Sequence, residues 1–199
     1  MKLTDEMGRE LIHFAKRFSQ EDIPTIVAGG YGLVLKNRWL RDTDERTLYS
    51  NLPPARSTAD IDLFLTVEVI SNVSKAEFIR KELKKRGYEP VEGAENYQFS
   101  RDLTEGRSLK IDLLTPEPQD DKENIRVKAQ RVRPQGASNT IHGRKVPEAI
   151  SLEENVKELR ISGETEEATI FLPDPFTYYL LKLFALRDRR NEPLLVRHH

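Results

Sequence analysis

Six residues, Asp60-Ile61-Asp62-Leu63-Phe64-Leu65, constrain the fold of this chain more than any others. Their β-branched and aromatic side chains predict a strand, and side chains alternate between the two faces of a strand. Asp60 and Asp62 therefore share one face, while Ile61, Leu63 and Leu65 share the other and can be buried. The fold must cover the apolar face of this strand and keep two carboxylates side by side on the other.

A third acid has a matching context at residues 108–114. Leu109, Ile111 and Leu113 alternate there with Lys110, Asp112 and Leu114, so Asp112 lies on the face opposite the apolar one. Neighbouring carboxylates repel each other, and burying their charge is costly without a cation. A hard divalent cation such as Mg²⁺ suits oxygen ligands, and three carboxylates on adjacent strands can hold two such ions for phosphoryl chemistry. We therefore predict a metal site at Asp60, Asp62 and Asp112.

A glycine pair precedes these strands. Residues 25–28 are β-prone, Gly29-Gly30 follows, and residues 31–40 have a helical pattern. Glycines allow close backbone approach, and the start of a helix favours an anion. A dinucleotide fingerprint is excluded because Leu35 occupies the place of its last glycine, and no Gly-Lys-Ser/Thr follows to make a P-loop. We expect Gly29 and Gly30 to approach a phosphate.

The remaining pattern predicts an α+β fold with a short mixed sheet flanked by helices. We expect an amphipathic helix at 3–18, a loop at 41–56, and a helix at 74–86 capped by Ser74 with Glu77 and ended by Gly87. Strands at 97–100 and 108–114 are expected to form a hairpin through 104–106, and 168–172 is expected to be a further strand. A C-terminal helix starts at Asp174-Pro175, with an apolar face formed by Phe176, Tyr179, Leu180, Leu183 and Phe184.

Composition excludes several classes of site. The chain has no cysteine, so disulfides, thiolate zinc sites and cysteine nucleophiles are ruled out. Its four histidines are scattered and do not form a ligand set. No apolar signal core opens the chain and no apolar run has transmembrane length, so we expect a cytoplasmic protein without a membrane partner.

The charge is nearly balanced overall but locally uneven. The net charge of −1 gives no general field for gathering nucleic acid. Between Arg126 and Lys145, however, no acid interrupts a series of basic residues, namely Arg126, Lys128, Arg131, Arg133, Arg144 and Lys145. Two interpretations remain open: a solvated surface loop, or a flank that faces the anionic groups of a triphosphate or an RNA acceptor.

Taken together, these motifs resemble the polymerase-β-type nucleotidyltransferase superfamily. That superfamily has a Gly-Gly or Gly-Ser turn, an Asp-x-Asp or Asp-x-Glu strand, and a third carboxylate on a later strand. The chain is most similar to the AbiEii-like toxin family of minimal nucleotidyltransferases, whose Arg-x-Ser/Thr-x-Asp-Ile-Asp motif is matched by Arg56-Ser57-Thr58-Ala59-Asp60-Ile61-Asp62. The Lys-x-x-Ala-x-x-x-Arg helix of the family is matched by Lys182, Ala185 and Arg189. The resemblance covers most of residues 25–115 and 173–190, and it leaves 116–167 unassigned.

The resemblance implies both an organisation and a set of roles. It implies a catalytic domain at 1–172 and the start of a C-terminal helical region at 173–199. A nucleoside triphosphate would be the substrate, with two Mg²⁺ ions, or Mn²⁺, as cofactors. Asp60, Asp62 and Asp112 would bind the metal, and these three with Lys182 would be catalytic. The nucleotide would be contacted by Gly29, Gly30, Arg56, Thr58 and Lys182.

Other features of the resemblance leave the function open. The acceptor hydroxyl could belong to tRNA, a protein or a small molecule, and a cognate antitoxin is a further expected partner by family analogy. The gap from Gly30 to Asp60 is longer than the family pattern, and the chain ends soon after Arg189, where the family continues. Two alternatives compete: a non-catalytic binder with the same fold, and a manganese-dependent glycosyltransferase that uses Asp60 and Asp62.

Overall fold

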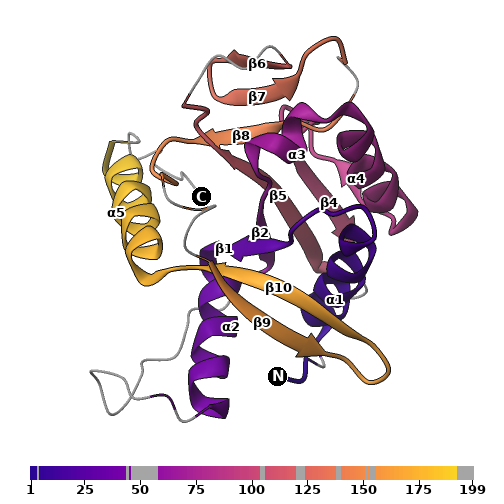
Figure 1. The fold of residues 1–199 in the computed structure, drawn as a ribbon, viewed down its shortest axis with the longest axis vertical. Coiled ribbons are helices and arrows are strands. Elements are labelled where there is room, and N and C mark those ends of the chain that lie inside the picture. The colour runs from indigo at the N-terminus through magenta and orange to yellow at the C-terminus, as the bar shows by residue number, and fades with distance from the viewer. Residues whose placement is uncertain are drawn as a thin grey trace.

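The structure is a computed structural model that describes residues 1–3, 5–43, 45, 58–103, 106–119, 124–137, 140–150, 152 and 156–191, with side chains up to residue 187. Within these residues it contains five α-helices and one ten-stranded mixed sheet (Figure 1). The helices are α1 (Glu6–Ser19), α2 (Gly29–Asp42), α3 (Val67–Ser71), α4 (Val73–Lys85) and α5 (Pro175–Asn191). The predicted combination of a mixed sheet, flanking helices and a C-terminal helix is confirmed at this level, whereas the expected short sheet is replaced by one of ten strands.

The sheet joins strands from the whole length of the chain. Its strands are β1 (Ile26–Ala28), β2 (Asp60–Phe64), β3 (Glu89–Pro90), β4 (Gln98–Asp102), β5 (Ser108–Pro116), β6 (Ile125–Lys128), β7 (Arg131–Pro134), β8 (Gly143–Val146), β9 (Val156–Ser162) and β10 (Glu167–Pro173). The main order is β6-β7-β8-β5-β2-β1-β10-β9, and β4 joins β3 to β5. β2 and β5 are parallel neighbours, as are β5 and β8, whereas β1 runs antiparallel to β2.

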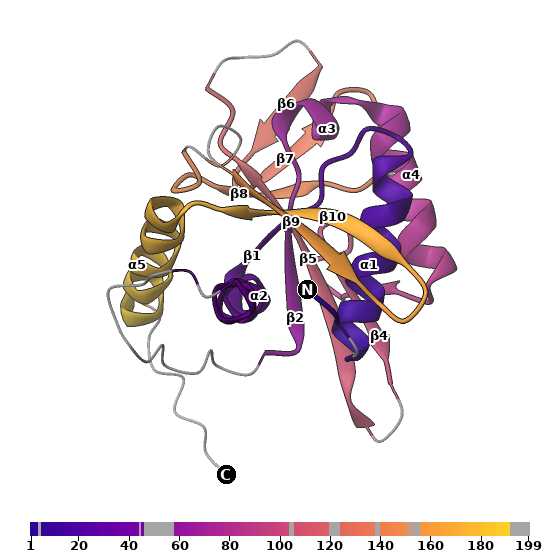
Figure 2. The same cartoon turned by 60° about the horizontal axis from the view of Figure 1, so that its bottom comes forward.

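Two apolar layers enclose the sheet. The larger one packs α1 and α4 against the apolar side chains of β2 and β5, including Ile61, Leu63, Ile111 and Leu113. The smaller one lies on the other face and joins Ile26, Phe64 and Leu114 to Tyr178 of α5. Figure 2 shows α1 and α4 on one side of the central strands and α2 and α5 on the other. The predicted alternation of β2 and β5 therefore decides which side chains the two layers receive.

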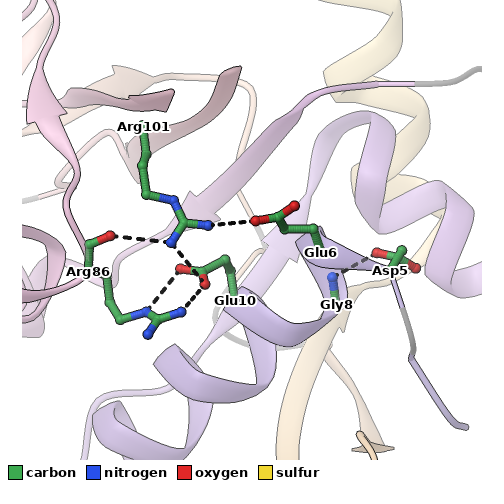
Figure 3. A network of polar contacts seen from close by, with 6 residues as sticks. All are labelled: Asp5, Glu6, Gly8, Glu10, Arg86 and Arg101. Atoms are coloured by element: carbon green, nitrogen blue, oxygen red, sulfur yellow. Dashed lines mark hydrogen bonds and ion pairs between the residues drawn. The ribbon is translucent and has the colours of Figure 1, made fainter. Parts of the chain in front are cut away.

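A paired ionic network is built into the layer formed by α1 and α4 (Figure 3). The side chain of Glu10 on α1 is only 2% exposed, and Arg86 and Arg101 both form ion pairs with it. Arg101 also contacts Glu6 at 3.2 Å and donates a hydrogen bond to the backbone carbonyl of Arg86. The buried charge of Glu10 is thus compensated within the fold.

Helix caps correct two predicted boundaries. α1 begins at Glu6 because Asp5 caps it by accepting a hydrogen bond from the Gly8 amide at 2.8 Å. The predicted Ser74 cap of α4 is wrong: Asn72 caps that helix through the Lys75 amide, and the additional short helix α3 precedes it. Gly87 follows α4 with a φ of +76°, which agrees with its predicted place at the helix end.

Four strands, β6 to β9, lie in the stretch 116–167 that the sequence left unassigned. β6, β7 and β8 were missed because each has only four residues, too few for alternation to be distinctive, and β9 because Lys157 and Glu158 place charges on successive positions. Of the predicted loop at 41–56, residues 41 and 42 belong to α2, and residues 44 and 46–56 lie outside the described part. The turn of the β4–β5 hairpin at 104 and 105 also lies outside it, whereas the pairing of those strands is confirmed.

The predicted apolar face of α5 is also corrected. Phe176 and Tyr179 are each 62% exposed and Leu183 is 45% exposed, while Tyr178 is buried. Asp174 does cap the helix, since its Oδ1 accepts hydrogen bonds from the amides of Phe176 and Thr177. None of the described helices combines the length and the apolar character needed to cross a membrane.

Candidate functional site

The three predicted acids meet on one face of the sheet. β2 and β5 pair in parallel so that Asp62 lies directly beside Asp112, and Asp60 lies beside Lys110. Because paired residues of adjacent strands project to the same side, Asp60, Asp62 and Asp112 share the face opposite α1 and α4. Alternation alone predicted the face of each strand. The structure adds the register, which aligns Asp62 with Asp112.

The glycine pair belongs to the first turn of α2 and not to a separate turn. Gly29 has a φ of +62°, and a Cβ added there would lie 1.5 Å from Oδ2 of Asp62. Only glycine fits this position, because the carboxylate of Asp62 packs directly on the backbone. A Cβ on Gly30 would lie 3.1 Å from Cβ of Thr58. The start of α2 and the two acids of β2 therefore form one compact unit.

A cleft of about 1130 Å³ opens between this unit and α5. The start of α2 contributes Gly29 and Gly30, and β2 contributes Asp60 and Asp62. The far walls come from β8 and α5 and carry basic side chains, namely Arg144, Lys145, Lys182 and Arg187. Asp112 is not among the described residues that line the cleft. The space thus has acids at its base and cations on its walls.

The carboxylates of the site are poorly compensated. Burial, together with the charges of Asp112 and Asp60, raises the pKa of Asp62 to about 6, and Lys182 and Arg144 oppose this shift. Burial also raises the pKa of Asp112, although a hydrogen bond from Gln98 opposes this shift. Among the described residues, none forms an ion pair with these three acids. A cation is the missing partner that this arrangement favours.

The side chain of Asp112 is held in place by a hydrogen bond from a neighbouring strand. Gln98 of β4 pairs with Asp112 of β5, and its Nε2 donates to Oδ1 of Asp112 at 2.7 Å. In the conformation described, no three acidic or histidine side chains of the described residues are arranged to hold a metal ion. The chemistry of the donor set nevertheless suits a hard cation, because the three carboxylates supply only oxygen ligands.

Tyr178 fixes α5 to the rest of the site. Its hydroxyl donates to the Val27 carbonyl at 3.3 Å, and a Cβ on Gly32 would lie 2.1 Å from that hydroxyl oxygen. Burial raises the pKa of Tyr178, and the charge of Asp62 adds to the shift. The tyrosine therefore stays neutral and holds the helix that carries Lys182 against β1.

The structure places two of the other predicted residues at the cleft, and two have side chains outside the described part. Thr58 lies at the cleft and its Oγ1 accepts a hydrogen bond from the Asp60 amide at 3.3 Å. Lys182 is exposed and lines the cleft. Arg56 lies outside the described residues, and Arg189 is helical with its side chain outside them.

Sequence reasoning missed two residues of the site. Arg144 lines the cleft and its charge acts on both Asp62 and Asp112. Its only signal was membership of the acid-free basic stretch. Gln98 could have been found, because a hairpin turning at 104–106 places it opposite Asp112.

Comparison with family models, with curated proteins and with solved structures gives no match for this chain. Its function is therefore inferred from the residues of the cleft and their geometry.

Proposed function

We propose that this chain is a metal-dependent nucleotidyltransferase with a polymerase-β-like fold, which moves a nucleoside monophosphate from a nucleoside triphosphate to a hydroxyl acceptor. One observation carries the proposal. Asp62 and Asp112 lie side by side on parallel strands, with Asp60 on the same face, where the start of α2 meets the cleft. An acidic site beside a helix start suits a ligand that brings both cations and phosphates.

Asp60, Asp62 and Asp112 would hold the metal, with Mg²⁺ the preferred ion and Mn²⁺ a substitute. Bound there, the metal would supply charge compensation for the triphosphate and for the leaving pyrophosphate. The raised pKa values of Asp62 and Asp112 support this role, because a cation would relieve the repulsion that causes part of the shift.

The phosphates would be held from two sides. The first amides of α2 have no partner within their own helix, no side chain caps them, and the first turn contains no acid. Lys182 faces them from α5, and Arg144 lies on β8. Gly29 and Gly30 leave room for a phosphate to approach the backbone, as a larger residue would not.

The reaction follows from this arrangement. An acceptor hydroxyl oxygen attacks the α-phosphorus, the bond to the bridging oxygen breaks, and pyrophosphate leaves with the electron pair. The hydroxyl proton would pass to a carboxylate oxygen of Asp112, which lies beside Asp62 on the acidic face. Gln98 orients this carboxylate through its hydrogen bond.

Ligand binding is the first test. Thermal unfolding is measured with Mg²⁺ and each ribonucleoside triphosphate, in wild type, in Asp62→Asn and in Asp102→Asn, a matched change at an exposed position of β4. A ligand at about a hundred times its Kd adds roughly 2.7 kcal/mol, which raises the midpoint by about 5–10 °C. We expect this rise in wild type and Asp102→Asn only. No rise with any triphosphate would overturn the proposal.

Turnover is the second test, because binding alone also fits a non-catalytic protein. Incorporation of label from α-labelled triphosphates into RNA, protein and small-molecule fractions is compared between wild type and Asp60→Asn. We expect label in one fraction and its loss in the variant. Binding without incorporation would favour the non-catalytic alternative, for which the hydrogen bond that engages Asp112 is the favouring observation. Stabilisation by Mn²⁺ with a sugar nucleotide would favour the glycosyltransferase.

A further inference from the structure

Five cations are aligned across the β6, β7 and β8 edge of the sheet. Lys128 lies opposite Arg131, Arg131 lies opposite Arg144, and Arg126 lies opposite Arg133. Residues two apart on a strand share a face, so all five belong to one face of the sheet. We call this set the basic row, formed by Arg126, Lys128, Arg131, Arg133 and Arg144.

The basic row is unfavourable for the fold itself. Like charges directly opposite each other on neighbouring strands destabilise a sheet, and the row contains three such pairs. No described residue forms an ion pair with any of its members. Arg131 is held by the Gly93 carbonyl and lies over the Tyr97 ring, while Arg126, Lys128 and Arg144 are exposed. Like charges held together, without an ion pair to any acid among the described residues, favour an anionic partner.

The basic row leads directly into the cleft. Arg144 is its innermost member, and it pairs across β8 and β5 with Leu114, which also lines the cleft. Leu114 and Asp112 are two residues apart on β5 and so share a face. The cations and the acids therefore lie on one continuous face, with Arg144 at the boundary between them.

The form of the row favours a chain of phosphates. Neighbouring strands are about 4.8 Å apart, so three strands present cations over roughly 10 Å, enough for several phosphates of one strand. Four of the five members are arginines, whose planar guanidinium groups bind phosphate with two parallel hydrogen bonds. A nucleic acid also carries a terminal hydroxyl, which is the acceptor group that the adjacent cleft requires.

We propose that the basic row binds the phosphate backbone of a nucleic-acid strand and directs its terminal hydroxyl into the cleft. This inference rests on the proposed function and names the class of its acceptor. Arg144 is then shared between the strand and the triphosphate, and the other four residues bind the strand alone. The sugar of the strand, ribose or deoxyribose, is decided by the test.

The test measures binding of fluorescent single-stranded RNA and DNA oligonucleotides by anisotropy at several salt concentrations, without any triphosphate. The variant is Arg126→Gln with Arg133→Gln. The control is Lys81→Gln with Lys84→Gln, which removes the same charge from exposed positions of α4. Each phosphate contact to a single strand contributes about 0.7 to the slope of log K against log salt. We expect the slope to fall by about 1.4 in the variant and to stay unchanged in the control.

Each outcome has a distinct meaning. Preference for RNA or for DNA identifies the acceptor within the proposal. The proposal would be overturned if the chain bound no oligonucleotide at low salt, or if the control weakened binding as much as the variant. Equally tight binding of polyglutamate would also overturn it and would favour an acidic protein as the partner. Triphosphate binding is measured separately by thermal unfolding. Oligonucleotide binding can therefore fail while triphosphate binding supports the proposed function, and triphosphate binding can fail while oligonucleotides still bind. The variant should melt no lower than wild type, because it removes a like-charge pair.

Discussion

The two faces of the sheet differ in whether their buried carboxylates form ion pairs with cationic side chains. On the face covered by α1 and α4, Glu10 and Glu82 are each 2% exposed and each has two cationic partners. On the other face, Asp62 and Asp112 are partly buried side by side, and no described cation forms an ion pair with either. The first face completes its charge balance within the chain, whereas among the described residues the second leaves it incomplete.

This difference separates charges that the fold balances from charges that the proposed site would use. Glu10 has its partners in Arg86 and Arg101, so it requires nothing further. An uncompensated group persists only where the surrounding structure enforces it, which is common at sites that bind ligands. The contrast is therefore a physical criterion for the site, independent of any motif.

The largest expected loss of stability comes from substituting a glycine in a left-handed conformation, and the chain offers one such glycine on each face of the sheet. Gly87→Ala should cost about 1–2 kcal/mol, because the new Cβ meets only Arg101 at 3.6 Å and the cost is that of the backbone conformation. Gly29→Ala should cost at least about 4 kcal/mol, because its Cβ would overlap Oδ2 of Asp62. Urea unfolding measures both. Equal costs would mean that Asp62 does not pack on Gly29.

The next effect is removal of a paired carboxylate. Glu10→Ala should destabilise the chain by about 3 kcal/mol, since it leaves Arg86 and Arg101 without their shared partner. Glu77→Ala, an exposed helical position of α4, is the control and should change stability by less than about 0.5 kcal/mol. The same unfolding experiment applies, and similar values for the two variants would remove the basis of the contrast.

Removal of an unpaired carboxylate should change the free energy of unfolding in the opposite direction. Asp62→Asn should stabilise the ligand-free chain by about 2 kcal/mol at pH 7.5, because it removes an ionised group that the fold disfavours. The folded pKa of about 6 lies above the ordinary value of 3.8, so the penalty is absent below pH 3.8 and complete above pH 6. The advantage of the variant should therefore shrink as the pH falls from 6 towards 4. A destabilised variant at pH 7.5 would show that Asp62 is compensated after all.

The smallest effect concerns His142, a buried neutral imidazole next to the basic row. Burial lowers its pKa to about 4, with a further contribution from Arg133 and Arg131. The unfolded chain therefore takes up a proton first, and stability should be lost as the pH falls from 6.5 towards 4. Between pH 7 and pH 6 this loss should be roughly 0.5–1 kcal/mol in wild type, and it should disappear in His142→Leu. Identical pH profiles for the two proteins would contradict the shift.

Alternation predicted more of the site than of the fold around it. The apolar and polar faces of β2 and β5 follow from residues 60–65 and 108–114, because a strand buried on one face must alternate. The start of α2 at Gly29 and the alignment of Asp62 with Asp112 depend on tertiary packing, which a local pattern does not contain. The basic row was visible only as a charge series, because the pairing of its three short strands depends on tertiary structure.

The prediction of the apolar face of α5 failed for a different reason. Its periodicity favoured a face containing Phe176 and Leu183, yet the buried ring belongs to Tyr178. That ring is accommodated because Gly32 has no side chain, a fact that lies in another part of the sequence. Helical periodicity cannot reveal a space left by a distant residue.

The contact between Gly32 and Tyr178 also restricts how this chain can evolve. The two positions share one volume, since a Cβ on Gly32 would lie 2.1 Å from the tyrosine hydroxyl. The same Cβ would lie 2.8 Å from the Val27 carbonyl oxygen, so a descendant with a larger residue at position 32 would need a smaller residue at position 178 and a shift of β1 as well. It would then lose the hydrogen bond to the Val27 carbonyl that ties α5 to β1. Homologues that keep β1 in place should therefore retain Gly32, and a sequence that changes Tyr178 alone identifies a lineage in which α5 is attached differently.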